Sequence, residues 1–144
     1  MAHKRFDKDL FEKYDKIGRD AAKAYYRNLG NTIDDNTNKY GPDLIISVSG
    51  SFLAYVECEV KRKWTEPAFP SDIVRFPERK AKYLTGEKIY FFMTSADGSR
   101  ALIVDGNQLK ADSLKEFKNS FVPHGELFYH VTLDNVIFVD VGKK

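Results

Sequence analysis

The sequence is poor in cysteine and histidine, the residues that commonly build disulfides and zinc sites. Cys58 is the single cysteine among 144 residues, so the chain cannot form an internal disulfide or a thiolate-rich zinc site. The histidines are scattered, and the interval between His124 and His130 does not suit zinc binding. This composition is typical of a protein from a reducing compartment, and we expect the cytoplasm.

Long apolar runs and glycine-rich phosphate-binding motifs are also missing. No stretch approaches the ~20 apolar residues that a membrane-spanning helix needs. The first residues, MAHKRFDKDL, lack the apolar segment of a signal peptide. Neither the P-loop pattern nor the dinucleotide-binding pattern GxGxxG occurs. We therefore expect no membrane partner and no nucleotide cofactor.

The net charge of +2 is too small to indicate a nucleic-acid-binding protein by itself. The distribution of basic residues is more informative than their sum. Basic side chains gather after one predicted strand and again in the next element, at Lys61, Arg62, Lys63, Arg75, Arg79, Lys80 and Lys82. We interpret these clusters as surfaces that contact phosphate; the alternative is an ordinary solvated surface of mixed charge.

The length predicts a single domain over residues 1–144, and 42% of the residues are hydrophobic, enough to form a core. Apolar residues recur at helical spacing over the first thirty residues, and Gly30 is a suitable helix end. After that helix the sequence predicts a polar loop at 31–38 and a hairpin, whose strands start at 44 and cover 52–61 around a turn at 49–51. A proline-containing loop over 64–77 and a short helix over 78–84 follow. The remaining predicted elements are paired strands over 89–94 and 101–104, a loosely helical segment over 109–117 and a strand over 136–141. This order predicts an α/β fold with a mixed central β-sheet flanked by helices.

The second hairpin strand carries charged and apolar residues on opposite faces. Side chains alternate along a strand, so Glu57, Glu59 and Lys61 point one way, while the apolar residues between them point towards a core. Two carboxylates and an ammonium group therefore form a row. The alternative is that these three residues form the solvated face of an edge strand.

Asp43 begins the partner strand of this hairpin. With a turn centred at Gly50, residues whose numbers add to about 100 face each other, which pairs Asp43 with Glu57. We expect the carboxylates of Asp43, Glu57 and Glu59 to converge. Mg²⁺ is bound through one or two carboxylates, water and substrate phosphate. Two acids, a metal ion and a lysine are sufficient for phosphodiester hydrolysis.

Pro42-Asp43 followed by Glu59-Val60-Lys61 resembles the PD-(D/E)XK signature of restriction endonucleases and archaeal Holliday-junction resolvases. In that superfamily the aspartate begins one strand of a hairpin, and Glu-x-Lys lies on the second strand. The resemblance implies a restriction-endonuclease-like fold in which Asp43 and Glu59 bind the metal, the Val60 carbonyl is a further ligand and Lys61 is the catalytic lysine. It also implies Mg²⁺ as the cofactor, with Mn²⁺ as a substitute.

Two further acids are candidates for this site. The superfamily commonly places an acid on the first helix, and Asp20 lies three residues after Ile17 and four before Ala24, on the apolar face. We predict that Asp20 supports the site; the alternative is a salt bridge on the helix surface. Glu57 is an additional metal ligand or, in the alternative register Glu57-Cys58-Glu59, the metal-binding acid itself.

These features predict a metal-dependent endonuclease acting on DNA. The chain has little room for a domain that reads sequence, so we expect recognition of a DNA structure or end. Lys63, Arg79 and Lys80 are predicted to position the DNA backbone, and a homodimer would supply two sites for cutting two strands. The alternative is a catalytically inactive module of the same fold that binds nucleic acid or a protein partner. Lys61 with both acids intact favours the enzyme.

Overall fold

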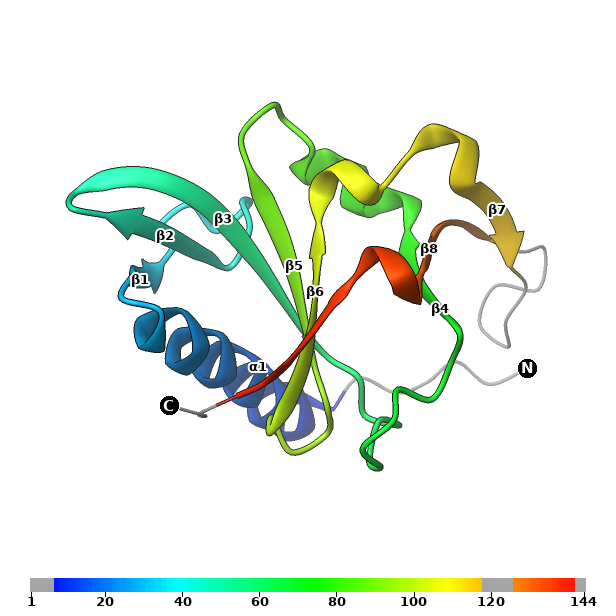
Figure 1. Ribbon diagram of the computed structural model, residues 1–144, viewed down its shortest axis with the longest axis horizontal. Coiled ribbons are helices and arrows are strands. Elements are labelled where there is room, and N and C mark those ends of the chain that lie inside the picture. Colours follow the sequence, from blue (N-terminus) through cyan, green and yellow to red (C-terminus); the bar gives the residue numbers. More distant parts are fainter. Residues whose placement is uncertain (1–6, 118–125, 142–144) are drawn as a thin grey trace.

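A computed structural model describes residues 7–117 and 126–141 of the chain (Figure 1). Within them one long helix, α1 (Lys8–Asn28), accompanies two β-sheets. The larger sheet has the strand order β1 (Thr32–Asp35), β2 (Leu44–Val48), β3 (Ser51–Val60), β5 (Ile89–Thr94), β6 (Arg100–Asp105) and β9 (Ile137–Asp140). The smaller sheet has the order β4 (Ile73–Pro77), β8 (Glu126–Thr132) and β7 (Leu114–Phe117). The short 3-10 helices are η1 (Glu78–Tyr83), η2 (Gly106–Gln108), η3 (Ala111–Ser113) and η4 (Leu133–Asn135).

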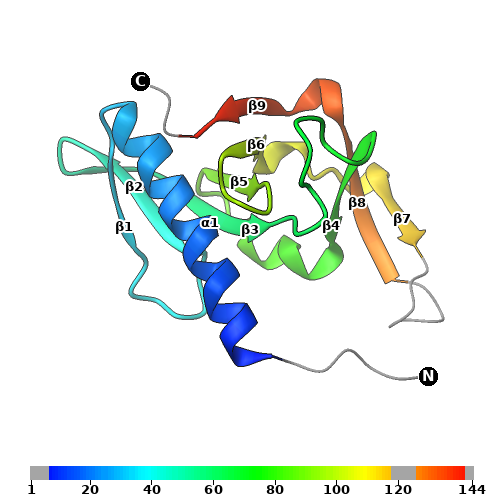
Figure 2. The ribbon, with the colours of Figure 1, turned by 90° about the horizontal axis from the view of Figure 1, so that it is seen from below.

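The larger sheet is mixed, which confirms the prediction. Strands β3 and β5 are parallel, and the other neighbouring pairs are antiparallel. A parallel pair needs a long crossover connection, and here the crossover contains β4 and η1 instead of an α-helix. Helix α1 lies across one face of the sheet (Figure 2). The prediction of flanking helices is therefore correct for that face and wrong for the other, which the smaller sheet covers.

Alternate residues of the central strands contribute to two cores, one on each face of the larger sheet. Val56 and Phe92 pack in the core beneath α1. Phe91 and Met93 pack in the second core, against residues of the smaller sheet that include Phe76. Because both faces of β3 and β5 are covered, these strands have few solvent-exposed positions in their second halves.

Helix α1 approaches the sheet closely because small residues line its buried face. Gly18, Ala21 and Ala22 are buried there together with Tyr26. A Cβ atom on Gly18 would lie 3.3 Å from Val60 Cγ2, so the helix backbone lies directly on the end of β3. The helix ends as predicted, with Gly30 at a φ of 90° and its N–H donating to the Arg27 carbonyl.

The β2–β3 hairpin has the register that the sequence predicts at its open end. Ser49 and Gly50, both at positive φ, form a two-residue turn that pairs Val48 with Ser51. A bulge on β3 then adds one residue, so Leu44 pairs with Val56. Asp43, directly before β2, consequently lies opposite Glu57.

Four segments differ from the prediction, and one of them is β8 (Glu126–Thr132), which forms where no element is predicted. The polar loop at 31–38 contains β1, the proline-containing loop at 64–77 contains β4, and the segment 109–117 forms η3 and β7 instead of a helix. Strand β4 tolerates Pro77 because it lies at the edge of its sheet and the proline is its last residue.

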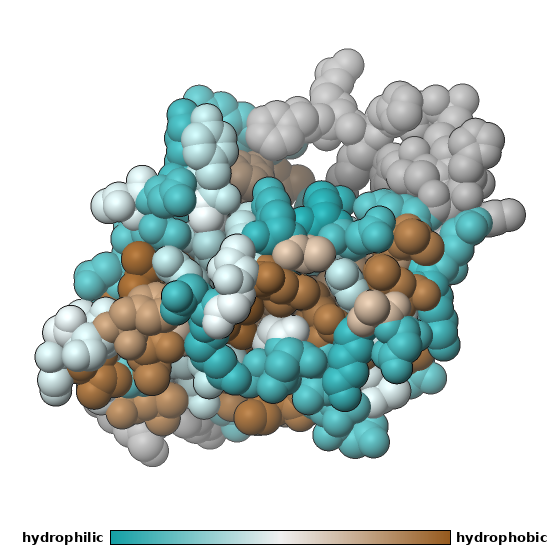
Figure 3. Space-filling view, turned by 90° about the horizontal axis from the view of Figure 1, so that it is seen from above, coloured by the Kyte–Doolittle hydropathy of each residue, from teal (hydrophilic) through white to brown (hydrophobic). Residues whose placement is uncertain are grey.

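No helix in the described part of the chain is long and apolar enough to cross a membrane. On the face drawn in Figure 3, hydrophobic residues are interspersed with hydrophilic ones that cover much of the rim. Exposed hydrophobic side chains also mark the hairpin tip, at Val48, Phe52 and Leu53.

Candidate functional site

Asp43 and Glu57 meet at the open end of the β2–β3 hairpin. The backbone N–H of Asp43 donates to Glu57 Oε1 at 3.2 Å. Glu57 is 8% exposed and β3 is a central strand, so the alternative of a solvated edge-strand face is wrong for this residue. Burial raises the pKa of Glu57 to about 7, and the nearby charge of Asp43 contributes to the rise.

Lys80 enters this site from η1. Its ammonium group lies 2.7 Å from Glu57 Oε2, and both side chains are largely buried. Burial acts to lower the pKa of Lys80, but the charges of Glu57 and Glu59 outweigh it and raise the pKa overall. Lys80 is therefore a charged group beside two carboxylates, and its predicted contact with the DNA backbone stays a prediction.

Glu59 and Lys61 form the next pair along the same face of β3. The Lys61 ammonium group approaches Glu59 Oε2 to 2.6 Å. This oxygen is buried, yet no donor reaches it in good hydrogen-bonding geometry. Lys61 follows the last residue of β3, where its N–H donates to the Thr94 carbonyl of β5 and continues the parallel pairing.

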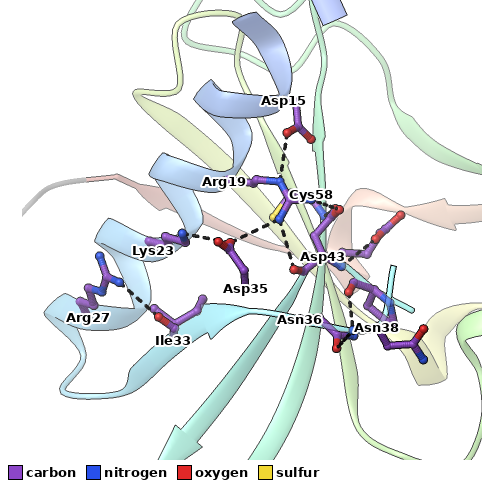
Figure 4. Close-up of polar contacts among 12 residues, drawn as sticks. Asp15, Arg19, Lys23, Arg27, Ile33, Asp35, Asn36, Asn38, Asp43 and Cys58 are labelled. Atoms are coloured by element: carbon purple, nitrogen blue, oxygen red, sulfur yellow. Dashed lines mark hydrogen bonds and ion pairs between the residues drawn. The ribbon is translucent and has the colours of Figure 1, made fainter. Parts of the chain in front are cut away.

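The carboxylate of Asp43 is held by α1 and by β3 (Figure 4). Arg19 Nη2 donates to Asp43 Oδ1 at 2.8 Å, and the Cys58 N–H donates to Oδ2 at 2.9 Å. Arg19 Nε in turn donates to Asp15 at 3.0 Å. Burial acts to lower the pKa of Arg19, but Asp43 and Asp15 outweigh it and raise the pKa. The guanidinium therefore remains charged.

The helix acid nearest this site is Asp15, and the prediction that Asp20 points inwards is wrong. The Asp20 side chain is 58% exposed and pairs with Lys16 at 2.6 Å, the surface salt bridge considered as the alternative. The face that packs on the sheet runs through residues 15, 18, 19, 22 and 26, which follow helical spacing. Asp15 and Arg19 were missed, although the small residues Gly18 and Ala22 mark this face in the sequence.

The other residues predicted to belong to the site are Val60, Lys63 and Arg79. Val60 ends β3 beside α1 and contacts the helix at Gly18. Lys63 is exposed in the turn after β3. Arg79 is exposed and pairs with Glu126 of β8 at 3.3 Å, so its guanidinium points towards the smaller sheet.

Cys58 lies beside the site but is no candidate nucleophile. Burial raises the pKa of its thiol well above the ordinary value, and the charges of Asp43 and Glu57 raise it further. A thiol with a raised pKa is a poor nucleophile near neutral pH.

A divalent metal ion could be held here by two carboxylates. Among residues 7–117 and 126–141, no three acidic, histidine or cysteine side chains converge into a ready ligand set. Mg²⁺, however, is commonly bound through one or two carboxylates with water as the remaining ligands. The carboxylates of Asp43 and Glu57 are close enough for the Asp43 charge to act on Glu57, and they meet this requirement; Glu59 follows Glu57 on the same face of β3.

Comparisons with known proteins give no relative. No protein-family model matches the chain, and no match is found among the curated proteins or the solved structures. The function is therefore inferred from the residues and contacts described above.

Proposed function

We propose that the protein is a metal-dependent nuclease that hydrolyses phosphodiester bonds in DNA, with a restriction-endonuclease-like active-site hairpin. The observation that supports the proposal is a cluster of acidic and basic side chains at the end of β3: Glu57 accepts the N–H of Asp43 and pairs with Lys80, and Glu59 pairs with Lys61. Phosphodiester hydrolysis needs carboxylates that bind a divalent cation and cations that stabilise the charge on phosphate. Both kinds of group are present.

In this proposal Asp43 and Glu57 hold Mg²⁺, for which Mn²⁺ substitutes. The bound metal ion supplies a water molecule of lowered pKa and neutralises charge on the phosphate. Lys61 and Lys80 donate hydrogen bonds to the non-bridging oxygens of the scissile phosphate. Glu59 holds Lys61 in place at 2.6 Å.

The second metal ligand can be identified by substitution. The family resemblance assigns it to Glu59, whereas the contact with the Asp43 N–H favours Glu57. A ligand that binds only the folded state raises the melting temperature. We expect Glu57→Gln to abolish the rise caused by millimolar Mn²⁺, and Glu59→Gln to retain it. The opposite pattern would assign the ligand to Glu59.

The nuclease activity is tested with a labelled panel of duplex, single-stranded, flap and four-way-junction DNA in Mg²⁺, Mn²⁺ or EDTA. We expect cleavage with either metal and none in EDTA. Lys61→Ala should reduce the rate about 100-fold or more, because a cation is removed from the reacting phosphate. Lys110→Ala, a change of the same kind at an exposed position away from the site, is the matched control. Absence of cleavage by well-folded protein on every substrate would reject the proposal.

One observation favours the second candidate, an inactive module of the same fold. Each carboxylate of the site already has a cationic partner: Arg19 for Asp43, Lys80 for Glu57 and Lys61 for Glu59. Such a balanced cluster can also be purely structural. The two functions differ in their response to metal, because the module should show no change in melting temperature with millimolar Mg²⁺ or Mn²⁺.

A further inference from the structure

A cleft opens beside the candidate site, between the end of β3 and the smaller sheet. Its volume is about 440 Å³. The turn after β3, with Lys61 and Lys63, forms one side, and the loop at 69–71 forms another. Arg75 of β4 and Phe128 of β8 contribute from the smaller sheet. Figure 2 shows the chain running from the end of β3 to β4.

The cleft is positively charged. Of its charged lining residues in the described part of the chain, four are cationic and one, Glu59, is anionic. Glu59 is already paired with Lys61. Next to the cleft, burial lowers the pKa of His130, and the charges of Arg75 and Lys115 lower it further. The surroundings therefore favour an anionic ligand.

Aromatic rings stand beside these cations. Phe69 is half-buried, and its ring packs edge-on against Trp64 with the centroids 5.2 Å apart. Trp64 is 1% exposed, so the Phe69 ring packs against a side chain that is itself held in the core. Phe128 lines the cleft from β8. Aromatic rings and cations in one groove are the combination by which proteins bind single-stranded nucleic acid, with bases on the rings and phosphates on the cations.

We propose that this cleft binds a single-stranded segment of nucleic acid. A single strand exposes the faces of its bases to rings such as Phe69, whereas a duplex keeps its bases stacked inside the helix. The volume is that of a small-ligand pocket and suits one or two nucleotides, not a double helix.

The cleft is continuous with the candidate active site. Glu59 and Lys61 belong to both, so a strand in the cleft passes directly to the charged contacts at the end of β3. This part of the inference rests on the proposed nuclease function. If the strand in the cleft is the one that is cut, the preferred substrate has a single-stranded region beside the cleaved bond, such as a flap or a frayed end. A continuous duplex is then a poorer substrate.

The binding is tested by fluorescence anisotropy in EDTA, with a short labelled single strand and the matched duplex. We expect the single strand to bind at least about fivefold more tightly than the duplex. Lys63→Ala should weaken single-strand binding and reduce the slope of log K against log salt by about 0.7, because one phosphate contact is lost. Lys110→Ala, at an exposed position that does not line the cleft, should change neither quantity.

A second variant tests the role of the aromatic ring. Phe69→Leu keeps an apolar side chain but removes the stacking surface, so single-strand affinity should fall several-fold with the salt slope unchanged. The proposal is overturned if duplex binds as tightly as single strand, or if the Lys63 and Phe69 variants bind like wild type.

The experiments separate the proposal of single-strand binding in the cleft from the proposal of nuclease activity, because binding is measured without metal and cleavage needs it. Selective single-strand binding without cleavage in Mg²⁺ would support the cleft and reject the nuclease. Cleavage that is unaffected by Lys63→Ala and Phe69→Leu would reject the cleft and retain the nuclease.

Discussion

Arg19 on α1 donates to one carboxylate oxygen of Asp43 at 2.8 Å, while the other oxygen accepts the N–H of Cys58 on β3 at 2.9 Å. Asp43 therefore connects the helix with both strands of the hairpin, because it directly precedes β2 and contacts β3, the strand that carries Glu57. Arg19 and Asp43 are 29% and 22% exposed, so solvent screens their attraction only in part. This contact holds the helix and the hairpin in the arrangement on which the candidate site depends.

Removing the arginine should destabilise the fold measurably. Arg19→Ala leaves a partly buried carboxylate without its cation, and we expect a loss of about 1–3 kcal/mol in the free energy of unfolding by urea denaturation. Lys16→Ala removes the exposed partner of Asp20 and should cost less than about 0.5 kcal/mol. In a double-mutant cycle, Arg19→Ala and Asp43→Asn should couple by about 1 kcal/mol or more; additive effects would contradict the proposed connection.

The open end of the hairpin has the predicted pairing although the turn differs: the prediction centres an unbulged turn on Gly50, and the structure has a two-residue turn at Ser49-Gly50 followed by a bulge. Ser49-Gly50 suits a tight turn, and the apolar residues on both strands set the faces. The pairing of Asp43 with Glu57 is therefore confirmed. It depends on a bulge near Leu53 that has no distinct signal in the sequence, and an unbulged two-residue turn would have shifted the pairing by one residue.

The helix acid could not be chosen correctly from apolar spacing alone. Ile17 and Ala24 are only half-buried, whereas the closest contact with the sheet is made by Gly18 and its neighbours on that face. Counting apolar residues gives little weight to glycine, although a glycine permits the closest approach. The same spacing rule therefore led to Asp20 instead of Asp15.

The smaller sheet was missed because two of its strands, β4 and β7, are short and its pairing is long-range. Ile73 of β4 pairs with Thr132 of β8, far along the chain. The prolines of the preceding loop indicated irregular structure, and only Val74 and Phe76 of β4 are fully buried. Propensity over so few residues is weak evidence until the partner strand is known.

The stability of the metal-free protein should fall as pH rises towards neutral, through Glu57. The pKa of Glu57 is raised from 4.5 to about 7 in the folded state, mainly by burial, so folded protein holds this proton over a range where unfolded protein has lost it. The contribution is complete below about pH 4.5 and is lost as pH rises through 7. We expect Glu57→Gln in EDTA to flatten the melting-temperature profile over that window.

His130 also contributes to the pH dependence of stability, and comparing Glu57→Gln with wild type cancels this contribution. The pKa of His130 is lowered by burial and by Arg75 and Lys115, so this residue stabilises the fold as pH rises through the same region. Its effect is common to both proteins and cancels in the difference. Parallel profiles for wild type and Glu57→Gln would show that Glu57 titrates normally.

Gly98 supports the packing of α1 from the turn between β5 and β6. Its φ is 77°, and a Cβ atom there would lie 3.0 Å from Ile17 Cγ2 on α1. Gly86 has a φ of 96° with nothing within 4 Å of such an atom. Both alanine variants should lose about 1–2 kcal/mol through the left-handed backbone. Gly98→Ala should lose about 1 kcal/mol more by thermal unfolding, because the Ile17 side chain must shift to make room.

Equal losses for the two glycine variants would contradict this account of the helix contact. The comparison is direct because each substitution adds one methyl group at a positive φ in a turn. A larger loss for Gly86→Ala would mean that backbone strain, and not the approach of Ile17, determines the cost at these positions.

The two helix acids should differ in their effect on cleavage. Asp15 accepts from Arg19 Nε at 3.0 Å, and Arg19 holds Asp43, whereas Asp20 pairs only with Lys16 among the described contacts. Asp15→Asn weakens the positioning of Arg19, so we expect the metal-dependent rate to fall about tenfold with the metal concentration for half-maximal rate increased. Asp20→Asn should leave both quantities within about twofold of wild type, because surface ion pairs contribute little. A loss confined to Asp20→Asn would restore the apolar-face assignment and remove Asp15 from the site.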